Sequence, residues 1–277
     1  MDLKKFNLNN SVAFITGAGG FLGLQHAEAL LKSGATVILS DISKKGLEKS
    51  TNFLKDRYEL GKIIQIYVDV TSPNSIKEAK KIINDKNLFV DILINNAAID
   101  PKVKEDLNLN ASSRLESFDP FEWDKQIAVG LTGAFNCIKI FGADMAQSER
   151  NCVILNIASD LSVIAPDQRI YKKQGLGEKF QPVKPVTYSV IKSGLVGLTK
   201  YVATYWCKQG VRCNALSPGG IFNNQNKEFV KRINNLIPMD RMANIDEYQG
   251  AVQFLCSEAS SYMTGQNIVI DGGRSIW

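Results

Sequence analysis

The fold is decided by residues 12–23, which read VAFITGAGGFLG. Val12–Thr16 is an unbroken run of apolar and β-branched residues, which predicts a strand with both faces buried. Four glycines follow at positions 17, 19, 20 and 23, where the helical pattern Phe21–Ser33 begins. Glycine lets the backbone turn tightly and approach a pyrophosphate, which the positive N-terminus of the helix then holds. Many strand–helix turns carry two glycines, but four in this context predict dinucleotide binding.

Apolar runs rich in Val and Ile alternate with helical patterns along the rest of the chain. The expected strands are Val12–Thr16, Thr36–Ser40, Ile63–Val68, Val90–Ile94, Cys152–Ile157, Val211–Leu216 and Asn267–Asp271. The expected helices are Phe21–Ser33, Ser43–Leu60, Asn74–Asp85, Asp119–Ala146, Tyr188–Lys208 and Ile245–Cys256. The strands are too continuously apolar for a sheet with one wet face. The alternation predicts an α/β fold, a Rossmann-type doubly wound parallel sheet of about seven strands with helices on both faces.

The length and composition favour one large domain over residues 1–277. Of the 277 residues 44% are hydrophobic and 22% charged, and the net charge of +5 is scattered rather than blocked. This composition gives no nucleic-acid footprint, and no apolar run approaches membrane-spanning length. The five cysteines form no Cys-x-x-Cys, so we expect buried free thiols in a reducing cytoplasm. The single histidine, His26, cannot build a His-centred metal site, and no metal is expected.

Two irregular segments, Asp100–Ser117 and Asp160–Thr187, interrupt the alternation, and loops this long within a domain are usually functional. The second has three prolines and two glycines and a charge balance of +2, from five basic and three acidic residues. We expect it to be a lid on the substrate site rather than part of the core. Its basic residues favour an anionic polar ligand. A second candidate wall, Gly220–Arg241, is more polar than a pocket for a steroid or a fatty-acyl group would be. The alternative is a solvated loop.

Asp41 ends the second expected strand, 24 residues after Gly17 (41 − 17). This offset suits a carboxylate that binds ribose hydroxyls and repels a 2′-phosphate. Ile42 follows it, and no Arg or Lys lies between positions 16 and 23. The pattern favours NAD over NADP. The alternative is that Asp41 caps the next helix, a role that Ser43 can equally fill.

Tyr188 and Lys192 stand four residues apart in a helical pattern and therefore share one face. A phenol that exchanges a proton near neutral pH needs a cation beside it, because its ordinary pKa is about 10. The spacing alone also suits a solvated helix face. Polar residues at two further strand ends, Asp69–Thr71 and Asn95–Ala98, lie where open α/β sheets bind ligands.

With these features placed, the chain resembles the short-chain dehydrogenase/reductase family over nearly its whole length. The motifs that carry the resemblance are the glycine turn 16–23, Asp69-Val70, Asn95-Asn96-Ala97, Asn156–Ser159, Tyr188–Lys192, Pro218-Gly219, Gly265-Gln266 and Asp271–Gly273. The resemblance implies that Tyr188 is the general acid/base, that Lys192 lowers its pKa and holds the nicotinamide ribose, and that Ser159 hydrogen-bonds the reacting oxygen. Besides Tyr188 and Lys192, the implied cofactor contacts are Gly17, Gly20, Phe21, Leu22, Gly23, Asp41, Ile42, Asp69, Val70, Asn95, Ala97, Pro218 and Ile221.

Three departures separate the chain from the family pattern. Phe21 replaces the usual second glycine, so the turn looks like that of the extended branch, which includes sugar-nucleotide epimerases and dehydratases. Gly130 stands where the family has an Asn that positions a water for proton transfer. Ser159 precedes Tyr188 by 29 residues (188 − 159), far more than the family's usual spacing. The enlarged lid resembles that of oxidoreductases in bacterial surface-carbohydrate biosynthesis, including flagellin modification.

These observations predict an NAD-dependent oxidoreductase that interconverts a secondary alcohol and a ketone on a polar, anionic carbohydrate: a phosphosugar, sugar nucleotide or sugar acid. One alternative is a non-catalytic NAD-sensing or scaffold protein, which should have lost Tyr188, Lys192 or Ser159. Another is an extended-branch epimerase or dehydratase, for whose substrate domain the chain leaves no room. The resemblance also implies a homotetramer or homodimer, through the helices Asp119–Ala146 and Tyr188–Lys208.

Overall fold

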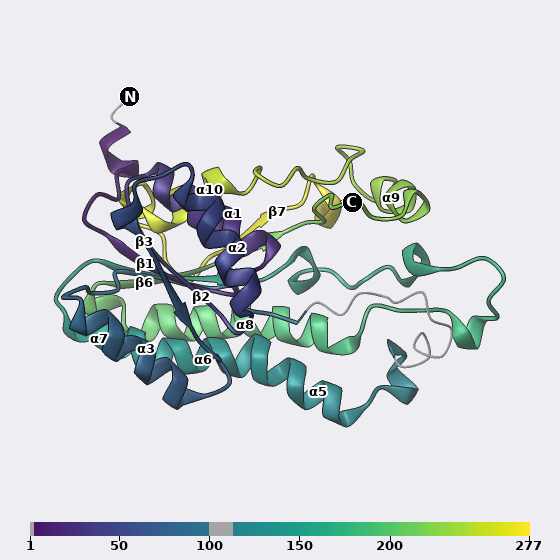
Figure 1. The fold of residues 1–277 in the computed structure, drawn as a ribbon. Coiled ribbons are helices and arrows are strands. Elements are labelled where there is room, and N and C mark those ends of the chain that lie inside the picture. Colours follow the sequence, from purple (N-terminus) through teal and green to yellow (C-terminus); the bar gives the residue numbers. More distant parts are fainter. Residues whose placement is uncertain (1–2, 100–112) are drawn as a thin grey trace.

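The computed structural model, which describes residues 3–99 and 113–277, is built on one seven-stranded parallel sheet (Figure 1). The strands are β1 (Val12–Thr16), β2 (Thr36–Asp41), β3 (Ile63–Tyr67), β4 (Ile92–Asn95), β5 (Cys152–Ile157), β6 (Val211–Pro218) and β7 (Asn267–Ile270). Their order in the sheet is β3-β2-β1-β4-β5-β6-β7, so the direction of winding reverses between β1 and β4. In open α/β sheets ligands bind at the carboxyl ends of the strands beside such a reversal. The predicted doubly wound sheet is confirmed.

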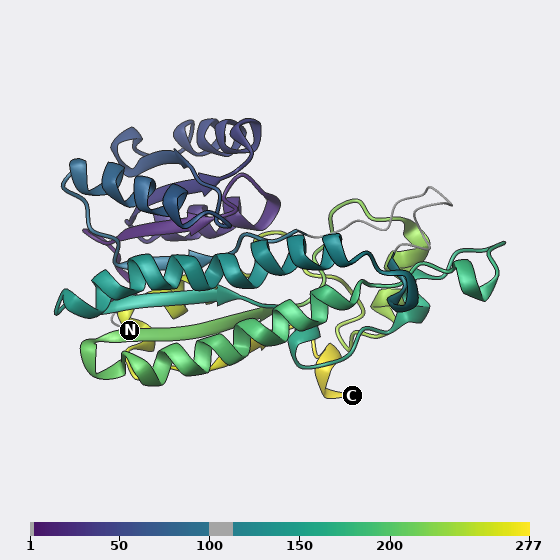
Figure 2. The same cartoon turned by 90° about the horizontal axis from the view of Figure 1, so that it is seen from below.

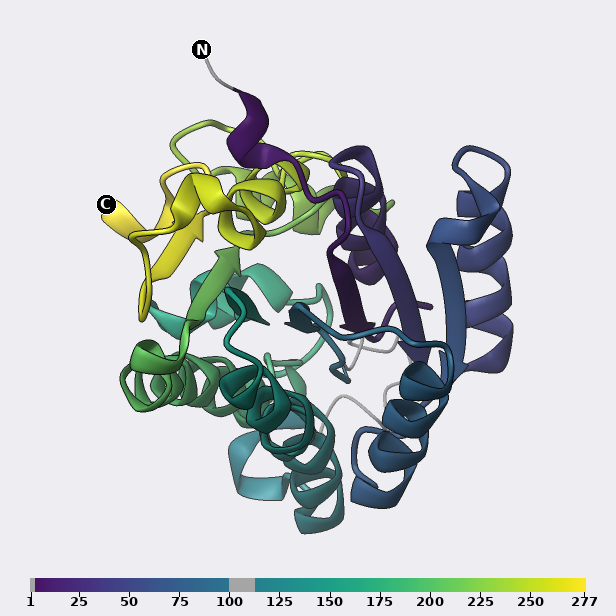
Figure 3. The same ribbon diagram turned by 90° about the vertical axis from the view of Figure 1, so that its left-hand side faces the viewer.

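Helices cover both faces of the sheet, as Figures 1 and 3 show. One face carries α1 (Phe21–Lys32), α2 (Lys44–Lys55) and α10 (Gln249–Cys256). The other carries α3 (Pro73–Asp85), α5 (Pro120–Ile127), α6 (Gly133–Cys137), α7 (Ala143–Gln147) and α8 (Val186–Tyr205). Neighbouring strand residues point to opposite faces. Ile15 accordingly packs in the cluster under α1 and α10, and Phe14 in the cluster under α3 and α6. The strands β1, β4 and β5 are buried along their whole length, which explains their continuous apolar runs.

The helix α5–α7 runs from Pro120 to Gln147 and contains two π-helical turns. The α-helical pieces are α5 (Pro120–Ile127), α6 (Gly133–Cys137) and α7 (Ala143–Gln147), and the π-helical turns are Ala128–Thr132 and Ile138–Gly142. By length and composition alone this helix could cross a membrane, but half of its most apolar stretch is buried inside the protein. Phe141 and Met145 pack on the sheet, and this packing accounts for the apolar composition.

Several element boundaries differ from those expected. The helix expected over Ile245–Cys256 begins only at Gln249, because the Glu247 carboxylate holds residues 244–247 in a turn, accepting from the Asn244 N–H and from Arg241. The helix α2 ends at Lys55 instead of Leu60, since the chain turns there to enter β3. The helix α9 (Lys227–Asn234) was not expected at all.

The lid, residues 160–187, runs out beyond the carboxyl ends of the strands toward α9, as Figures 1 and 2 show. It is built from short 3-10 turns over Asp160–Ser162, Gln168–Tyr171 and Glu178–Phe180. The expectation that no part of it belongs to a core is wrong at Ile170, which is buried with Ile233 and Ile237. Of the other irregular segment, residues 100–112 lie outside the described residues, and a 3-10 turn occupies Leu115–Ser117.

Four of the five cysteines are buried free thiols, as expected. Burial raises the pKa of Cys137, Cys213 and Cys256 to about 12, so these side chains stay protonated and act as small apolar groups. The expectation is wrong for Cys207, which lies in the turn after α8 and is exposed.

Candidate active site

The turn between β1 and α1 is too crowded for side chains at three of its glycines. Gly17 has φ of +66°, and a Cβ there would stand 2.9 Å from the Cα of Ala97. A Cβ at Gly19 would stand 2.8 Å from the backbone of Gly46, and one at Gly23 would stand 2.3 Å from the Gly17 oxygen. Gly20 is the N-cap of α1 and makes no side-chain capping bond. The N-terminus of α1 is therefore bordered by backbone, as close approach of a pyrophosphate requires.

Asp41 lies at the edge of this turn. Its Oδ2 accepts a hydrogen bond from the Gly19 N–H at 2.9 Å, and its Oδ1 accepts one from the Ser43 N–H at 2.7 Å. The N-cap of α2 is Ser43, whose Oγ accepts from the Gly46 N–H at 3.1 Å. Capping thus does not depend on Asp41, while Ile42 beside it is exposed. The glycine turn and the adjoining carboxylate together fit the dinucleotide that the family resemblance implies. Its pyrophosphate would lie at Gly17, Gly20 and Gly23, and its ribose at Asp41.

The end of β4 is held to the glycine turn by Asn96, which belongs to a quoted motif but is not among the expected cofactor contacts. Its side-chain Nδ2 donates to the Thr16 oxygen at 3.0 Å and to the Gly17 oxygen at 3.2 Å. Thr16 Oγ1 in turn accepts from the N–H groups of Asn96 and Ala97, each at 3.0 Å. Asn96 contacts a turn 79 residues away in the chain, so no local sequence pattern predicts these contacts.

Asn95 is buried and points between strands instead of toward the turn. Its Nδ2 donates to Asn156 Oδ1 at 2.8 Å, and Asn156 Nδ2 donates to Thr199 Oγ1 of α8 at 2.8 Å. The chain of side chains joins β4, β5 and α8. The expected contact of Asn95 with the cofactor would therefore come from its backbone.

The other expected cofactor residues also lie at the carboxyl ends of strands. Asp69 and Val70 follow β3, where Val70 is buried against Gly133. Pro218 ends β6, and Ile221 forms an isolated parallel bridge a few residues later. Phe21 and Leu22 occupy the first turn of α1, beside the glycine turn.

The helix α8 and the end of β5 carry the three expected catalytic side chains. Lys192 is buried, and its Nζ donates to the Ile157 oxygen of β5 at 2.7 Å. This Nζ lies 5.6 Å from the centroid of the Tyr188 ring. Ser159 follows β5 directly and is buried. The ammonium stands beside the phenol, as the four-residue spacing predicted.

A second cation, Lys184 of the lid, lies on the face of the same phenol ring. Its Nζ is 3.8 Å from the Tyr188 ring centroid, a contact worth about 0.5–2 kcal/mol in proteins. The Lys184 N–H donates to Gln168 Oε1 at 2.8 Å, which ties this position to the middle of the lid. The sequence does contain a signal for this contact. Lys184 lies four residues before Tyr188, and Lys192 lies four residues after it.

Two other basic side chains of the lid are held by acidic residues of the lid itself. Arg169 pairs with Asp167 at 2.6 Å, and its hydrogen bonds hold the pKa of the Asp167 carboxyl below its usual range. Lys172 pairs with Glu178 at 2.5 Å. The Lys184 ammonium, by contrast with these two side chains, lies over the ring of the expected catalytic phenol.

Gly130 lies buried in the first π-helical turn of the long helix and faces Ile191 of α8. A Cβ on Gly130 would stand 2.8 Å from Ile191 Cγ2. An Asn does not fit here unless Ile191 moves, so the family's water-positioning side chain has no room at this place. The packing of Gly130 against Ile191 therefore accounts for the glycine at the position of the family's Asn.

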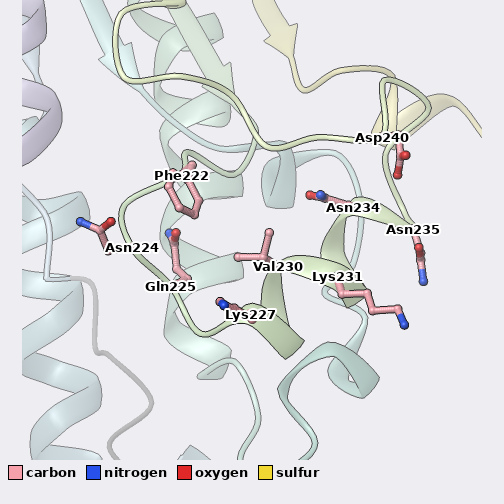
Figure 4. Close-up of a pocket in the computed structure, with 9 residues that line it drawn as sticks. All are labelled: Phe222, Asn224, Gln225, Lys227, Val230, Lys231, Asn234, Asn235 and Asp240. Atoms are coloured by element: carbon pink, nitrogen blue, oxygen red, sulfur yellow. The ribbon is translucent and has the colours of Figure 1, made fainter.

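A pocket of about 660 Å³ lies between the loop after β6 and α9 (Figure 4). It is lined by Phe222, Asn224, Gln225, Lys227, Val230, Lys231, Asn234, Asn235 and Asp240. All belong to the polar stretch Gly220–Arg241. The expected catalytic side chains are not part of its lining, and we regard it as a recess in the outer wall. Within residues 3–99 and 113–277, no group of three or more His, Cys, Asp and Glu side chains is arranged to hold a metal ion.

Known proteins resemble this chain over nearly its full length. A family profile described as enoyl-(acyl carrier protein) reductase matches residues 17–275. An NAD-dependent glycerol dehydrogenase of Listeria innocua is 30% identical over 99% of this chain and 97% of that protein. A short-chain dehydrogenase of Leptospira borgpetersenii, solved with bound NAD⁺, is 30% identical, with a TM-score of 0.83 over 100% of this chain and 97% of that one. A gluconate 5-dehydrogenase of Burkholderia cenocepacia, solved with NADP and tartrate, is 25% identical, with a TM-score of 0.83 over 99% of both chains.

Proposed function

This chain belongs to the short-chain dehydrogenase/reductase family, and from that membership we propose that it is an NAD-dependent dehydrogenase of a polar, anionic hydroxy compound of the carbohydrate type. Membership makes it an oxidoreductase of CH–OH groups. The relatives named above are dehydrogenases matched over almost their whole length, which favours neither the epimerase nor the scaffold alternative. The observation that carries the substrate class is Lys184 against the ring of Tyr188.

In the proposed reaction Tyr188 exchanges the hydroxyl proton of the substrate. Lys192 and Lys184 place two positive charges around its ring, and nearby cations favour the ionised form of a phenol. Bringing a phenol from a pKa of about 10 to about 7 requires about 4 kcal/mol, which a partly desolvated pair of ammonium groups can supply. Ser159 hydrogen-bonds the substrate oxygen. The bound nicotinamide accepts or supplies the hydride.

The position of Lys184 supports an anionic substrate. A substrate whose hydroxyl meets Tyr188 brings its neighbouring groups within reach of this ammonium, and a carboxylate or phosphate there gains a charge-assisted hydrogen bond. Tartrate, a hydroxy dicarboxylate, accompanies NADP in the Burkholderia cenocepacia enzyme. Sugar acids and phosphosugars head the proposal, including those of bacterial surface-carbohydrate and flagellin-modification pathways.

The preference for NAD is assigned to Asp41. Its carboxylate already accepts two backbone hydrogen bonds, which fix both oxygens at the glycine turn. A 2′-phosphate brought to this place would meet a fixed negative charge. The relatives do not decide the question, because their descriptions include both NAD and NADP.

The experiment is substrate-dependent NADH formation across sugar acids, phosphosugars and sugar nucleotides, each beside a neutral polyol of the same length. Lys184→Met should raise KM for the anionic substrate about 10–150-fold, which corresponds to the 1.5–3 kcal/mol of a hydrogen bond to a charged group. The affinity for NAD should change little. Lys179→Met, which removes an exposed lid cation, is the matched control and should leave KM unchanged.

Two results would overturn the proposal. Neutral polyols that are turned over as well as their acids would remove the anionic class. An unchanged KM in Lys184→Met would remove the assigned residue. Tyr188→Phe separates catalysis from simple cofactor binding, since it should abolish turnover and leave NAD affinity intact.

A further inference from the structure

Tyr67 ends β3 directly beside Asp41, the residue to which the preference for NAD is assigned. The two are register partners at the carboxyl ends of β3 and β2. Every second residue of a strand lies on the same face of the sheet. Leu39 of β2 and Ile63 of β3 are buried with Leu47 of α2, so Asp41 and Tyr67 lie on this face as well. Their side chains are therefore neighbours, since adjacent strands are about 4.8 Å apart.

The Tyr67 ring carries the ammonium group of Lys44, the first residue of α2. The Lys44 Nζ lies 5.5 Å from the centroid of the ring, and a cation in this range is attracted by the negative ring face. Both residues are exposed, so core packing does not impose the contact. Among the described residues no ion pair joins Lys44 to Asp41, although they are only three positions apart. The ammonium is thus held by the ring and not by the carboxylate.

A free ammonium at this place would favour NADP. The family resemblance puts the adenosine ribose at Asp41, and NADP differs from NAD by a phosphate on the 2′-oxygen of that ribose. Lysine combines a flexible side chain with a compact charge that binds phosphate. If Lys44 moved freely toward a 2′-phosphate, it would offset part of the repulsion by the Asp41 carboxylate. The contact with Tyr67 decides where this charge lies, and therefore bears on the choice of cofactor.

We propose that Tyr67 is a second determinant of cofactor preference, a positioning residue that holds Lys44 away from the 2′-position of the bound cofactor. The role rests on the proposed place of the adenosine ribose at Asp41. Asp41 repels a 2′-phosphate directly, whereas Tyr67 withholds a cation that would attract it. NAD carries a hydroxyl at this position, so it loses nothing when Lys44 stays on the ring.

The test measures the dissociation constants of NAD and NADP by isothermal titration calorimetry at low salt, with the full-length wild type, Tyr67→Leu and Tyr67→Phe. Tyr67→Leu should bind NADP about 2–5-fold more tightly than the wild type, which corresponds to the 0.5–1 kcal/mol of an exposed cation–ring contact. Its affinity for NAD should not change, which also shows that the variant is folded. Tyr67→Phe keeps the ring and should keep the wild-type preference.

Two double variants identify the cation. Adding Lys44→Met to Tyr67→Leu should cancel the gain in NADP affinity. Adding Lys45→Met instead removes the neighbouring exposed lysine and should leave the gain in place. The gain should also shrink between about 0.01 and 0.15 M salt, because dissolved ions screen the attraction between ammonium and phosphate. A change that merely loosened the end of β3 would show neither the dependence on Lys44 nor the dependence on salt.

Three results would overturn the proposal: an unchanged preference in Tyr67→Leu, an equal gain in Tyr67→Phe, or a gain that survives Lys44→Met. A wild type that binds NADP as tightly as NAD would instead contradict the role of Asp41. The proposal predicts a change relative to the wild type, whatever preference the wild type has. The failure of one assignment is therefore distinguishable from the failure of the other.

Discussion

Placing the family's Asn at position 130 should destabilise this protein. A Cβ on Gly130 would stand 2.8 Å from Ile191 Cγ2 and 3.2 Å from Ile191 Cδ1. Carbon atoms in contact are normally about 3.5–4.0 Å apart, so Ile191 must move by close to 1 Å. Ile191 is buried among Ala134 and Leu195 and is β-branched, so it has little freedom to do so.

The magnitude follows from two opposing effects. Overpacking of this kind costs about 1–3 kcal/mol. Asn has a higher helix propensity than Gly, which returns about 0.3 kcal/mol. Overpacking wins, and Gly130→Asn should lose about 1–2.5 kcal/mol, a fall in Tm of roughly 2–10 °C for a chain of this size. Turnover should fall as well, because Ile191 precedes Lys192 in α8.

The assay is thermal unfolding at fixed protein and NAD concentrations, since bound cofactor and assembly both shift Tm. Gly250→Asn is the control, because a Cβ at that position of α10 meets nothing within 4 Å. Ile191→Ala removes the clashing atoms, so its combination with Gly130→Asn should be more stable than the sum of the two losses by about 0.5–3 kcal/mol. Additive losses, or a Gly130→Asn protein as stable as the wild type, would refute the packing argument.

Three further predictions concern the cofactor, the pH dependence and the assembly. Wild-type protein should bind NAD at least about tenfold more tightly than NADP, and Asp41→Asn should reduce this difference in affinity. Equal affinities for the two cofactors in titrations of the wild type would contradict the assignment of NAD preference to Asp41. Burial lowers the pKa of His26 to about 4. An unfolded His has a pKa of about 6.5, so burying the neutral His26 does not lower the free energy of unfolding above that pH. As the pH drops toward 4, the free energy of unfolding should fall by up to about 3 kcal/mol. Tag-free protein has one imidazole to follow by NMR, and a midpoint near 6.5 would disprove its burial. Tyr201 and Tyr205 on α8 stack with their rings 5.6 Å apart and are 64% and 60% exposed. Replacing both with Glu should weaken the expected homotetramer or homodimer, and light scattering that gave a monomer for the wild type would exclude it.

The sheet was predictable because its physics is local. Strands buried on both faces need unbroken apolar runs, as in Val12–Thr16, and helices between them need one apolar stripe. The glycine turn was predictable for the same reason, since the crowding at Gly17 and Gly23 permits no other residue. The helix α9 was not predicted, because it is short and its Ile233 packs on the lid instead of the sheet.

The fine structure of the site was not predictable, because it depends on contacts between distant residues. Arg274 and Asp160 are 114 residues apart, and no sequence pattern near either residue predicts their ion pair. Sequence could not choose between Asp41 and Ser43 as the cap of α2, since both side chains accept hydrogen bonds; the structure uses each for a different N–H. The roles of Tyr188 and Ser159 came from family resemblance, and Tyr188→Phe tests the first of them.

The contact between the lid and α9 has a consequence for substrate exchange. Ile170 is buried against Ile233 and Ile237, and the Tyr171 ring lies 5.7 Å from that of Phe229. If the lid swung away alone, Ile170 would be exposed to water at about 1.5–3 kcal/mol. Moving the lid together with α9 keeps this contact dry and makes it the easier path. A lid that opens for product release would therefore carry α9 with it, and this larger moving body would be expected to open more slowly than the lid alone.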